Sequence, residues 1–176
     1  NLNALSNGLL DLAKASSDIS AIALRPLRFD EILWETKDKL IKRNKNYKIL
    51  IEFNDSISDE NELIIEGNEQ LIKTAIINLL DNACKFSTDH SACVSLSGND
   101  KFLITRIKDQ GPGIAPADLS HIFHPFFRAG NVRHIPGNGL GLSLAKKIIE
   151  IHQGIIRIDS VPENGTLVEI SIPHPT

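Results

Sequence analysis

Cysteine, methionine and surplus positive charge are scarce or missing in this sequence of 176 residues, and each shortage narrows the possible functions. The two cysteines, Cys84 and Cys93, lack the spacing of metal ligands and suggest no disulfide framework. We expect ordinary thiols in or near the core, which favours a reducing, cytoplasmic compartment. The formal net charge of −3 argues against broad nucleic-acid binding, because a surface that follows phosphates is usually basic.

Long apolar runs are also missing. No stretch is long enough to span a bilayer, and no signal peptide opens the chain. Because the chain starts at Asn1 and contains no Met, we expect a piece of a longer protein. With 41% hydrophobic and 23% charged residues, this piece is expected to form one domain with a packed core and a short appended element.

The first residues carry a short leucine stripe. Leu2, Leu5, Leu9 and Leu12 recur at spacings of three and four residues, as on one face of a helix. A helix of a few turns is not stable alone and needs a partner. Two interpretations stay open, namely a terminal helix packed on its own domain and the end of a dimerising helical bundle.

The rest of the chain mixes helical and strand patterns after a break at Arg25-Pro26. Apolar periodicity predicts helices over residues 29–44, 68–86 and 140–152. Alternation and turn signals predict strands over residues 48–53, 62–65, 92–97, 102–108, 154–160 and 166–172. Residues 111–136 are irregular and rich in Gly, Pro and His. This order predicts an α+β fold in which one mixed sheet carries helices on one face.

A polar stripe lies beside the apolar stripe of the helix that should begin after Asn68. The core face is formed by Ile72, Ile76, Leu79, Leu80 and Ala83, and the neighbouring polar face by Asn78, Asn82, Lys85 and Phe86. Asparagine is a mediocre helix former, so two of them one turn apart suggest a ligand. An amide oxygen suits Mg²⁺ and a lysine attracts phosphate, although a solvated polar face would give the same pattern.

Two glycine-containing loops follow. The D-x-G-x-G pattern of residues 109–113 comes directly after a strand, where a carboxylate can accept hydrogen bonds from an amine, but a simple Gly-Pro turn would also explain it. The G-x-G-x-G pattern of residues 137–141 precedes a helix, whose free N–H groups can cradle phosphate. The second loop is neither a Walker loop nor a dinucleotide fingerprint, and taken alone it could be a flexible connection.

These segments occur in an informative order, with the segment Ile-Phe-His-Pro-Phe-Phe-Arg at residues 122–128 between the two loops. From Phe29 to Pro173 the combination resembles the catalytic ATP-binding domain of sensor histidine kinases, within the GHKL ATPase superfamily. The resemblance implies the two-layer α/β sandwich called the Bergerat fold, ATP and Mg²⁺ as ligands, and protein-histidine kinase activity. It also implies a catalytic domain over residues 25–176, with residues 1–24 as the end of a dimerisation and phosphoacceptor helix and its linker.

The resemblance also implies roles for single residues. Asn82 would ligate Mg²⁺, and the residues acting at the phosphates would be Asn78, Lys85 and Arg128. The other implied nucleotide-binding residues are Phe86, Asp109, Gly111, Gly113, Ile114, Phe123, Phe127, Gly137, Gly139, Leu140, Gly141, Leu142 and Thr166. Asp109 would accept the adenine amine, and the phenylalanines near residue 125 would anchor a mobile lid. Phe86 is commonly a tyrosine in this family, so a hydroxyl is missing here.

The histidine that such a kinase phosphorylates is followed by an acidic residue. The six histidines of this chain are followed by Ser, Ile, Pro, Ile, Gln and Pro. We therefore expect a chain that binds ATP and does not phosphorylate itself. The implied partners are the phosphoacceptor helical domain of the same kinase and the receiver domain of a response regulator. The parent would be a homodimer, with an inner-membrane sensor as one candidate.

Two other functions remain as alternatives. A GHKL ATPase could use its nucleotide to drive clamping of a dimer, and a regulatory module could bind nucleotide without catalysis. Hydrolytic members of the superfamily carry a glutamate general base one turn before the metal-binding asparagine. Asn78 occupies that position here and cannot take a proton, which favours phosphotransfer. The intact polar residues and both glycine loops argue against a non-catalytic module.

Overall fold

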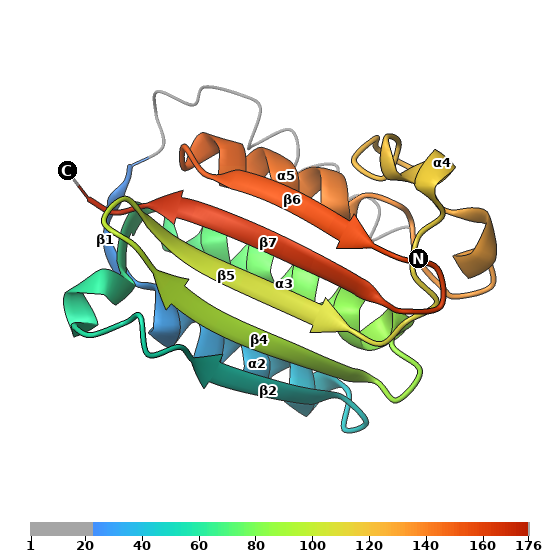
Figure 1. The fold of residues 1–176 in the computed structure, drawn as a ribbon, viewed down its shortest axis with the longest axis horizontal. Helices are drawn as coiled ribbons and strands as arrows, with labels where there is room; N and C mark the ends of the chain where they lie inside the picture. The colour runs from blue at the N-terminus through green and yellow to red at the C-terminus, as the bar shows by residue number, and fades with distance from the viewer. Residues whose placement is uncertain (1–22, 176) are drawn as a thin grey trace.

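A mixed five-stranded sheet forms one layer of the molecule (Figure 1). The computed structural model describes residues 23–175. In spatial order the strands are β2 (Lys48–Phe53), β4 (Ser91–Gly98), β5 (Phe102–Asp109), β7 (Thr166–Pro173) and β6 (Ile155–Ser160). The β2–β4 pair is parallel and the other three pairs are antiparallel, which confirms the predicted mixed sheet.

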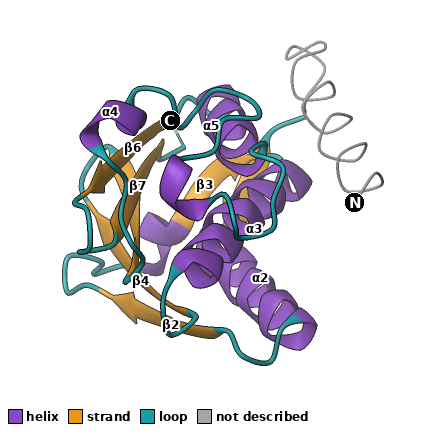
Figure 2. Cartoon of the chain, turned by 90° about the vertical axis from the view of Figure 1, so that its right-hand side faces the viewer, coloured by secondary structure: helices purple, strands orange, loops and turns teal. Residues whose placement is uncertain are grey.

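Three helices form the second layer, and they lie on one face of the sheet (Figure 2). They are α2 (Phe29–Arg43), α3 (Glu69–Phe86) and α5 (Gly141–Ile151). Asn68 caps α3 as predicted, since its side chain accepts a hydrogen bond from the N–H of Leu71 at 3.1 Å. The first helical residue of α5 is Gly141, one position later than predicted, because Leu140 forms the N-cap. The predicted α+β sandwich with helices on one face is therefore confirmed.

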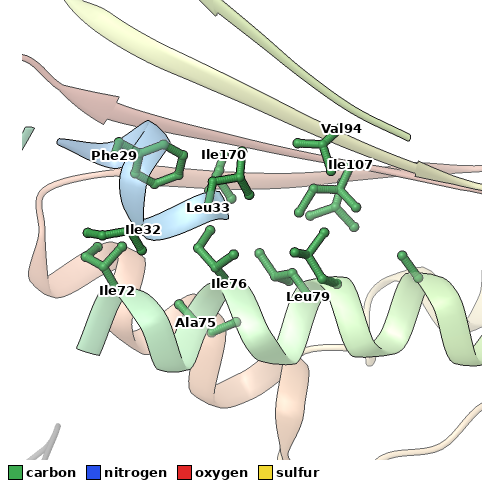
Figure 3. Close-up of a cluster of buried hydrophobic side chains, with 14 of the residues drawn as sticks. Phe29, Ile32, Leu33, Ile72, Ala75, Ile76, Leu79, Val94, Ile107 and Ile170 are labelled. Atoms are coloured by element: carbon green, nitrogen blue, oxygen red, sulfur yellow. The ribbon is translucent and has the colours of Figure 1, made fainter. Parts of the chain in front are cut away.

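The core lies between α3 and the inner face of the sheet. Figure 3 shows Ile72, Ile76 and Leu79 of α3 pointing toward the sheet, which contributes Val94 of β4, Ile107 of β5 and Ile170 of β7 to the same cluster. None of these six side chains is more than 1% exposed. Full burial of one such side chain contributes about 1.5–3 kcal/mol, so this contact fixes the rotation of α3 about its axis. The fixed rotation leaves the neighbouring polar stripe at the edge of the helical layer.

A second, two-stranded antiparallel sheet differs from the prediction. Its strands are β1 (Arg25–Arg28) and β3 (Ile64–Gly67). The sequence predicted only a break at Arg25-Pro26, because a strand of four residues has little local signal and needs its distant partner. The predicted strand at 62–65 begins two residues late, because Asp59 and Glu62 form a capping box for the short 3₁₀ helix η2 (Glu60–Leu63).

Two further expectations concern the thiols and the start of the chain. Cys84 is fully buried and is therefore a core side chain, as expected. Burial raises the pKa of its thiol to about 12. Cys93 is partly buried on the other face of the sheet. The leucine stripe of residues 2–12 lies outside the described residues, as do residues 1–22 of the predicted N-terminal segment 1–24. Over residues 23–175, no helix has both the length and the apolar character needed to cross a bilayer.

Candidate functional site

A pocket lies where α3 and the start of α5 meet the end of β5. Its outer side is formed by the segment between β5 and α5, which contains α4 (Pro116–Leu119) and η3 (Gly130–Val132) and lies at the arrowhead end of β5 in Figure 1. We call residues 115–136 of this segment the lid. The predicted site residues that line the pocket are Asn78, Asn82, Phe86, Asp109, Gly113, Ile114, Phe127, Arg128, Gly139, Gly141, Leu142 and Thr166. The fold thus brings together residues from five separate segments of the sequence, at 78–86, 109–114, 127–128, 139–142 and 166.

A buried carboxylate stands at one end of the pocket. Asp109 is the last residue of β5, and its Oδ1 accepts hydrogen bonds from the backbone N–H groups of Gly111 at 2.8 Å and Thr166 at 3.2 Å. Burial raises the pKa of Asp109, and these two hydrogen bonds limit the rise by stabilising the charged form. No other described residue donates to this carboxylate. Its second oxygen therefore remains available to a donor on a ligand.

Glycines let the backbone around Asp109 pack without side chains. Gly113 has φ of +67°, and a Cβ atom there would lie 2.2 Å from the carbonyl oxygen of Val161. Gly165 has φ of +81°, and its Cβ would lie 2.2 Å from the carbonyl oxygen of Asp109. Real Cβ atoms do not approach so closely, so both positions require glycine. Close backbone packing therefore holds the carboxylate in place from two loops.

Ser160, which the sequence analysis did not identify, completes this end of the pocket. Its Oγ accepts a hydrogen bond from the N–H of Ile114 at 3.0 Å and donates to the carbonyl of Gly165 at 2.8 Å. It also lies 2.9 Å from Oγ1 of Thr166. We call Asp109, Gly113, Ser160, Gly165 and Thr166 the base side. Its hydrogen bonds join the loop after β5 to the β6–β7 turn.

Two asparagine amides stand at the other end of the pocket. Nδ2 of Asn78 donates to the carbonyl of Thr74 at 2.8 Å, which leaves its Oδ1 free. Asn82 lines the pocket, and its side chain makes no hydrogen bond with any described residue. A Cβ atom at Gly141 would lie 2.9 Å from Oδ1 of Asn78 and 3.5 Å from the amide of Asn82. The start of α5 therefore approaches both amides because residue 141 has no side chain.

This polar end fits a divalent cation with phosphate. Amide oxygens are hard ligands of the kind that Mg²⁺ takes, and Mg²⁺ retains several waters or phosphate oxygens besides protein ligands. The first N–H groups of α5 have no partners within the helix and attract anions. Among residues 23–175, no three His, Cys, Asp or Glu side chains gather in a way that could hold a metal ion. A cation at this site would therefore depend on the asparagines and on its ligand.

Some predicted site residues do not line the pocket. They are Lys85, Gly111, Phe123, Gly137 and Leu140. The ammonium of Lys85 lies 4.7 Å from the centre of the Phe86 ring, and a Cβ at Gly137 would lie 3.0 Å from it. Burial lowers the pKa of Lys85. Lys85 therefore lies beside the end of the lid, next to the pocket wall.

The other three support the walls from behind. A Cβ at Gly111 would lie 2.7 Å from the carbonyl oxygen of Phe86, so this glycine lets the loop close against α3. The ring of Phe123 packs under the ammonium of Lys146 on α5, 4.9 Å from its centre. Leu140 is buried in the start of α5.

Arg128 lines the pocket, but its guanidinium contacts the lid itself. Nη2 donates to the carbonyl of Val132 at 2.8 Å and also to the carbonyl of Ile135. In this conformation the arginine therefore fixes the shape of the lid. An orientation toward phosphates would require these two hydrogen bonds to be exchanged.

Several lining residues were missed by the sequence analysis. Pro112, Ile122, Ala129, Asn131, Val132, Asn138, Ile158 and Val168 also line the pocket, together with Leu79 and Ala83, which were expected only in the core. Ile158 and Val168 could have been found from the alternation of β6 and β7, since they face the helices. The lid residues carry no periodic signal.

Comparisons with known proteins agree with this geometry. Residues 67–176 match the model of the family described as histidine kinase-, DNA gyrase B-, and HSP90-like ATPase. The heme sensor protein HssS of Staphylococcus saprophyticus is 35% identical over 144 residues, which is 76% of this chain and 31% of HssS. The adaptive-response sensory kinase SasA of Synechocystis is 38% identical over 109 residues, which is 61% of this chain and 28% of SasA. The chain thus spans about a third or less of these curated relatives.

Solved structures give the same result. The mycobacterial sensor histidine kinase MprB superposes with a TM-score of 0.72 at 27% identity, over 87% of this chain and 99% of that one. The catalytic domain of histidine kinase ThkA superposes with a TM-score of 0.69 at 26% identity, over 86% of this chain and 97% of that one. The chain therefore belongs to the histidine kinase-, DNA gyrase B- and HSP90-like ATPase family, and it is a catalytic ATP-binding domain of the sensor histidine kinase type.

Proposed function

We propose that this chain binds Mg²⁺ and ATP and presents the γ-phosphate to a histidine on the phosphoacceptor helical domain of the same kinase. The observation that carries the proposal is the two-ended pocket. A buried carboxylate with one free oxygen stands at one end, and two amides beside the start of α5 stand at the other. Such a pocket is complementary to a molecule with an amine at one end and phosphates at the other.

The base side would select adenine. An ionised carboxylate only accepts hydrogen bonds, so Asp109 suits the exocyclic amine of adenine. Guanine presents a carbonyl oxygen at the corresponding position, where two acceptors would face each other. The apolar lining residues Leu79, Ile158 and Val168 would pack against the flat ring. Thr166 and Gly113 would border the base.

The polar end would hold the phosphates. Asn82 would ligate Mg²⁺, with Asn78 beside it, and the metal when bound would neutralise phosphate charge. The N–H groups at the start of α5 would receive phosphate oxygens in the glycine loop of residues 137–141. Lys85 would add positive charge from beside the lid, and Arg128 would do so once it exchanges its hydrogen bonds to the lid.

Phosphotransfer fits the site better than hydrolysis. Hydrolysis needs a base that activates water near the γ-phosphate, and Asn78 is an amide whose Nδ2 already donates to the carbonyl of Thr74. The protein's contribution would be positioning and charge stabilisation, with the imidazole of the partner domain attacking in line. The parent would be a homodimeric sensor kinase whose phosphohistidine supplies the receiver domain of a response regulator.

Incubation with γ-labelled ATP tests the proposal. The chain alone should bind Mg·ATP in titration calorimetry and carry no acid-labile phosphohistidine. Label should appear on a histidine only after a phosphoacceptor fragment of the parent kinase is added. Rapid release of inorganic phosphate by the chain alone would point to an ATPase, and stable labelling of the chain itself would refute the assignment.

Removal of the metal tests the polar end separately. Asn82→Ala should weaken the binding of Mg·ATP by about tenfold or more and should weaken metal-free ATP much less, because an oxygen ligand matters only when the cation is present. Titrations in Mg²⁺ and in a chelator make the comparison. Equal losses under both conditions would mean that Asn82 is structural.

A further inference from the structure

One side-chain hydrogen bond joins the lid to the base side. Nδ2 of Asn131, in η3 of the lid, donates to the backbone carbonyl of Gly113 at 3.1 Å. Both residues line the pocket, so the bond lies across its margin. Asn131 itself is exposed and is not part of any residue pattern recognised in the sequence. Its bond therefore calls for an explanation other than core packing.

The acceptor of this bond belongs to a fixed loop. Gly113 has a positive φ, with its Cα packed against the carbonyl of Val161. The neighbouring N–H of Ile114 donates to Ser160, and the carbonyl of Pro112 accepts from the N–H of Glu163 at 2.9 Å. Bonds on both sides of Gly113 thus fix the direction of its carbonyl before any ligand arrives.

The donor belongs to a part of the lid with its own shape. The N–H of Val132 donates to the carbonyl of Ala129 at 3.3 Å, and the N–H of Ile135 donates to the carbonyl of Val132 at 3.1 Å. Arg128 holds the carbonyls of Val132 and Ile135. These contacts are all within the lid, so they shape it without attaching it to the base side.

We propose that Asn131 is a positioning residue that latches the lid to the Gly113 carbonyl and thereby slows the release of nucleotide. The proposal rests on the assigned nucleotide pocket for its ligand, but the latch itself exists without ligand. When the bond breaks, η3 separates from the base side, and its short turn, which is not stable alone, opens with it. When it forms, Ala129 and Val132 close the margin of the pocket beside the base.

The latch has a defined strength. A hydrogen bond of an exposed side chain to backbone is modest, so its loss should raise the open population of the lid roughly three- to tenfold. A contribution of this size favours the closed lid and still permits exchange of nucleotide. A stronger attachment would trap product.

Hydrogen exchange of the nucleotide-free chain tests the latch directly. In Asn131→Ala, the bonded N–H groups of Val132 and Ile135 should exchange roughly three- to tenfold faster than in the parent. Asn131→Asp keeps the shape of the side chain but cannot donate, so it should behave in the same way. The N–H of Ile114, bonded to Ser160 on the base side, should exchange at the parent rate in both variants. His134→Ala removes an exposed lid side chain with no role in the latch and is the matched control.

Dissociation of a fluorescent ADP, measured by stopped flow, tests the consequence. Asn131→Ala should dissociate roughly three- to tenfold faster, with a smaller change in the association rate, and His134→Ala should match the parent. Parent-like exchange at Val132 and Ile135 in both Asn131 variants would overturn the latch. If instead the parent bound no nucleotide, the assigned function would fail while the exchange result still stood. Faster exchange with unchanged dissociation would overturn the claim about nucleotide release.

Discussion

The base side and the lid border the same pocket but are built in opposite ways. On the base side, Asp109 is 7% exposed, and Gly113 and Gly165 bring two backbone loops together so closely that a single Cβ would collide. In the lid, a Cβ at Gly130 would meet nothing within 4 Å. The hydrogen bond that joins the lid to the base side comes from one side chain, that of Asn131. Most lid side chains between His121 and Pro136 are exposed or half-buried.

We expect this difference to give the two regions different tasks, with the base side recognising the ligand and the lid controlling its entry and release. A base that must be identified needs a carboxylate whose position does not change, and tight packing with backbone hydrogen bonds provides it. A phosphate that must leave needs a cover that opens, and segments with few buried contacts open at low free energy. We therefore expect mutations on the base side to change stability and specificity, and mutations in the lid to change rates.

Glycine substitutions give the largest expected contrast. Gly113→Ala would combine a positive φ with a 2.2 Å approach to the carbonyl of Val161, so it should lower the free energy of unfolding by about 2–4 kcal/mol. Gly130→Ala has open space around the new methyl group and should change stability by less than about 0.5 kcal/mol. Urea unfolding of both variants makes the comparison. Equal effects would show that the base side is not the more rigid of the two.

Exchange of one carboxylate oxygen for an amide gives the next largest effect. In Asp109→Asn the side-chain oxygen can still accept from Gly111 and Thr166, while the new NH₂ group faces the pocket. ATP should lose about 1–3 kcal/mol of binding free energy, because two donors would then meet, and GTP should lose less or gain. Calorimetry with both nucleotides measures the change in preference. An unchanged ratio of the two affinities would mean that Asp109 only shapes the turn.

The sequence predicted the base side and the framework better than the lid. The apolar stripe of α3 and the alternation of the strands follow local periodicity, which made the sheet, the core face and the cluster of Asn78 and Asn82 predictable. Strand β1 was not predictable, because its stability comes from pairing with a segment some 40 residues away. In the lid, the hydrogen bond of Asn131 to Gly113 and the bond of the Arg128 guanidinium to the lid's own backbone depend on an irregular chain path. Such a path leaves no repeating pattern in the sequence.

The contact between the end of α5 and the start of α3 can also be loosened by pH, which is the smallest effect we expect. His152, at the end of α5, is 2% exposed, and its Nε2 accepts a hydrogen bond from the N–H of Asn68 at 3.0 Å. Its Nδ1 lies 2.7 Å from the carbonyl of Ile148, so Nδ1 carries the proton and the ring is neutral. This histidine joins the end of α5 to the start of α3, far from the lid.

Burial lowers the pKa of His152, because the charged imidazolium is disfavoured there, and the bond to Ile148 only partly opposes this. An unfolded histidine titrates near about 6.5. Between that value and the lower folded pKa, the unfolded chain binds more protons, so the free energy of unfolding falls as pH decreases through this range. The contribution is fully present above about pH 6.5 and is lost once pH drops below the folded pKa.

Replacement of His152 tests this pH dependence. In His152→Leu the N–H of Asn68 loses its hydrogen-bond acceptor, so the variant should be less stable than the parent at neutral pH. Its free energy of unfolding should also change less steeply with pH, because the titrating imidazole is gone. Urea unfolding of the parent and the variant between about pH 7.5 and about pH 5 compares the slopes, to which every other titrating group contributes equally. Parallel slopes would mean that His152 is not the group that couples the framework to pH.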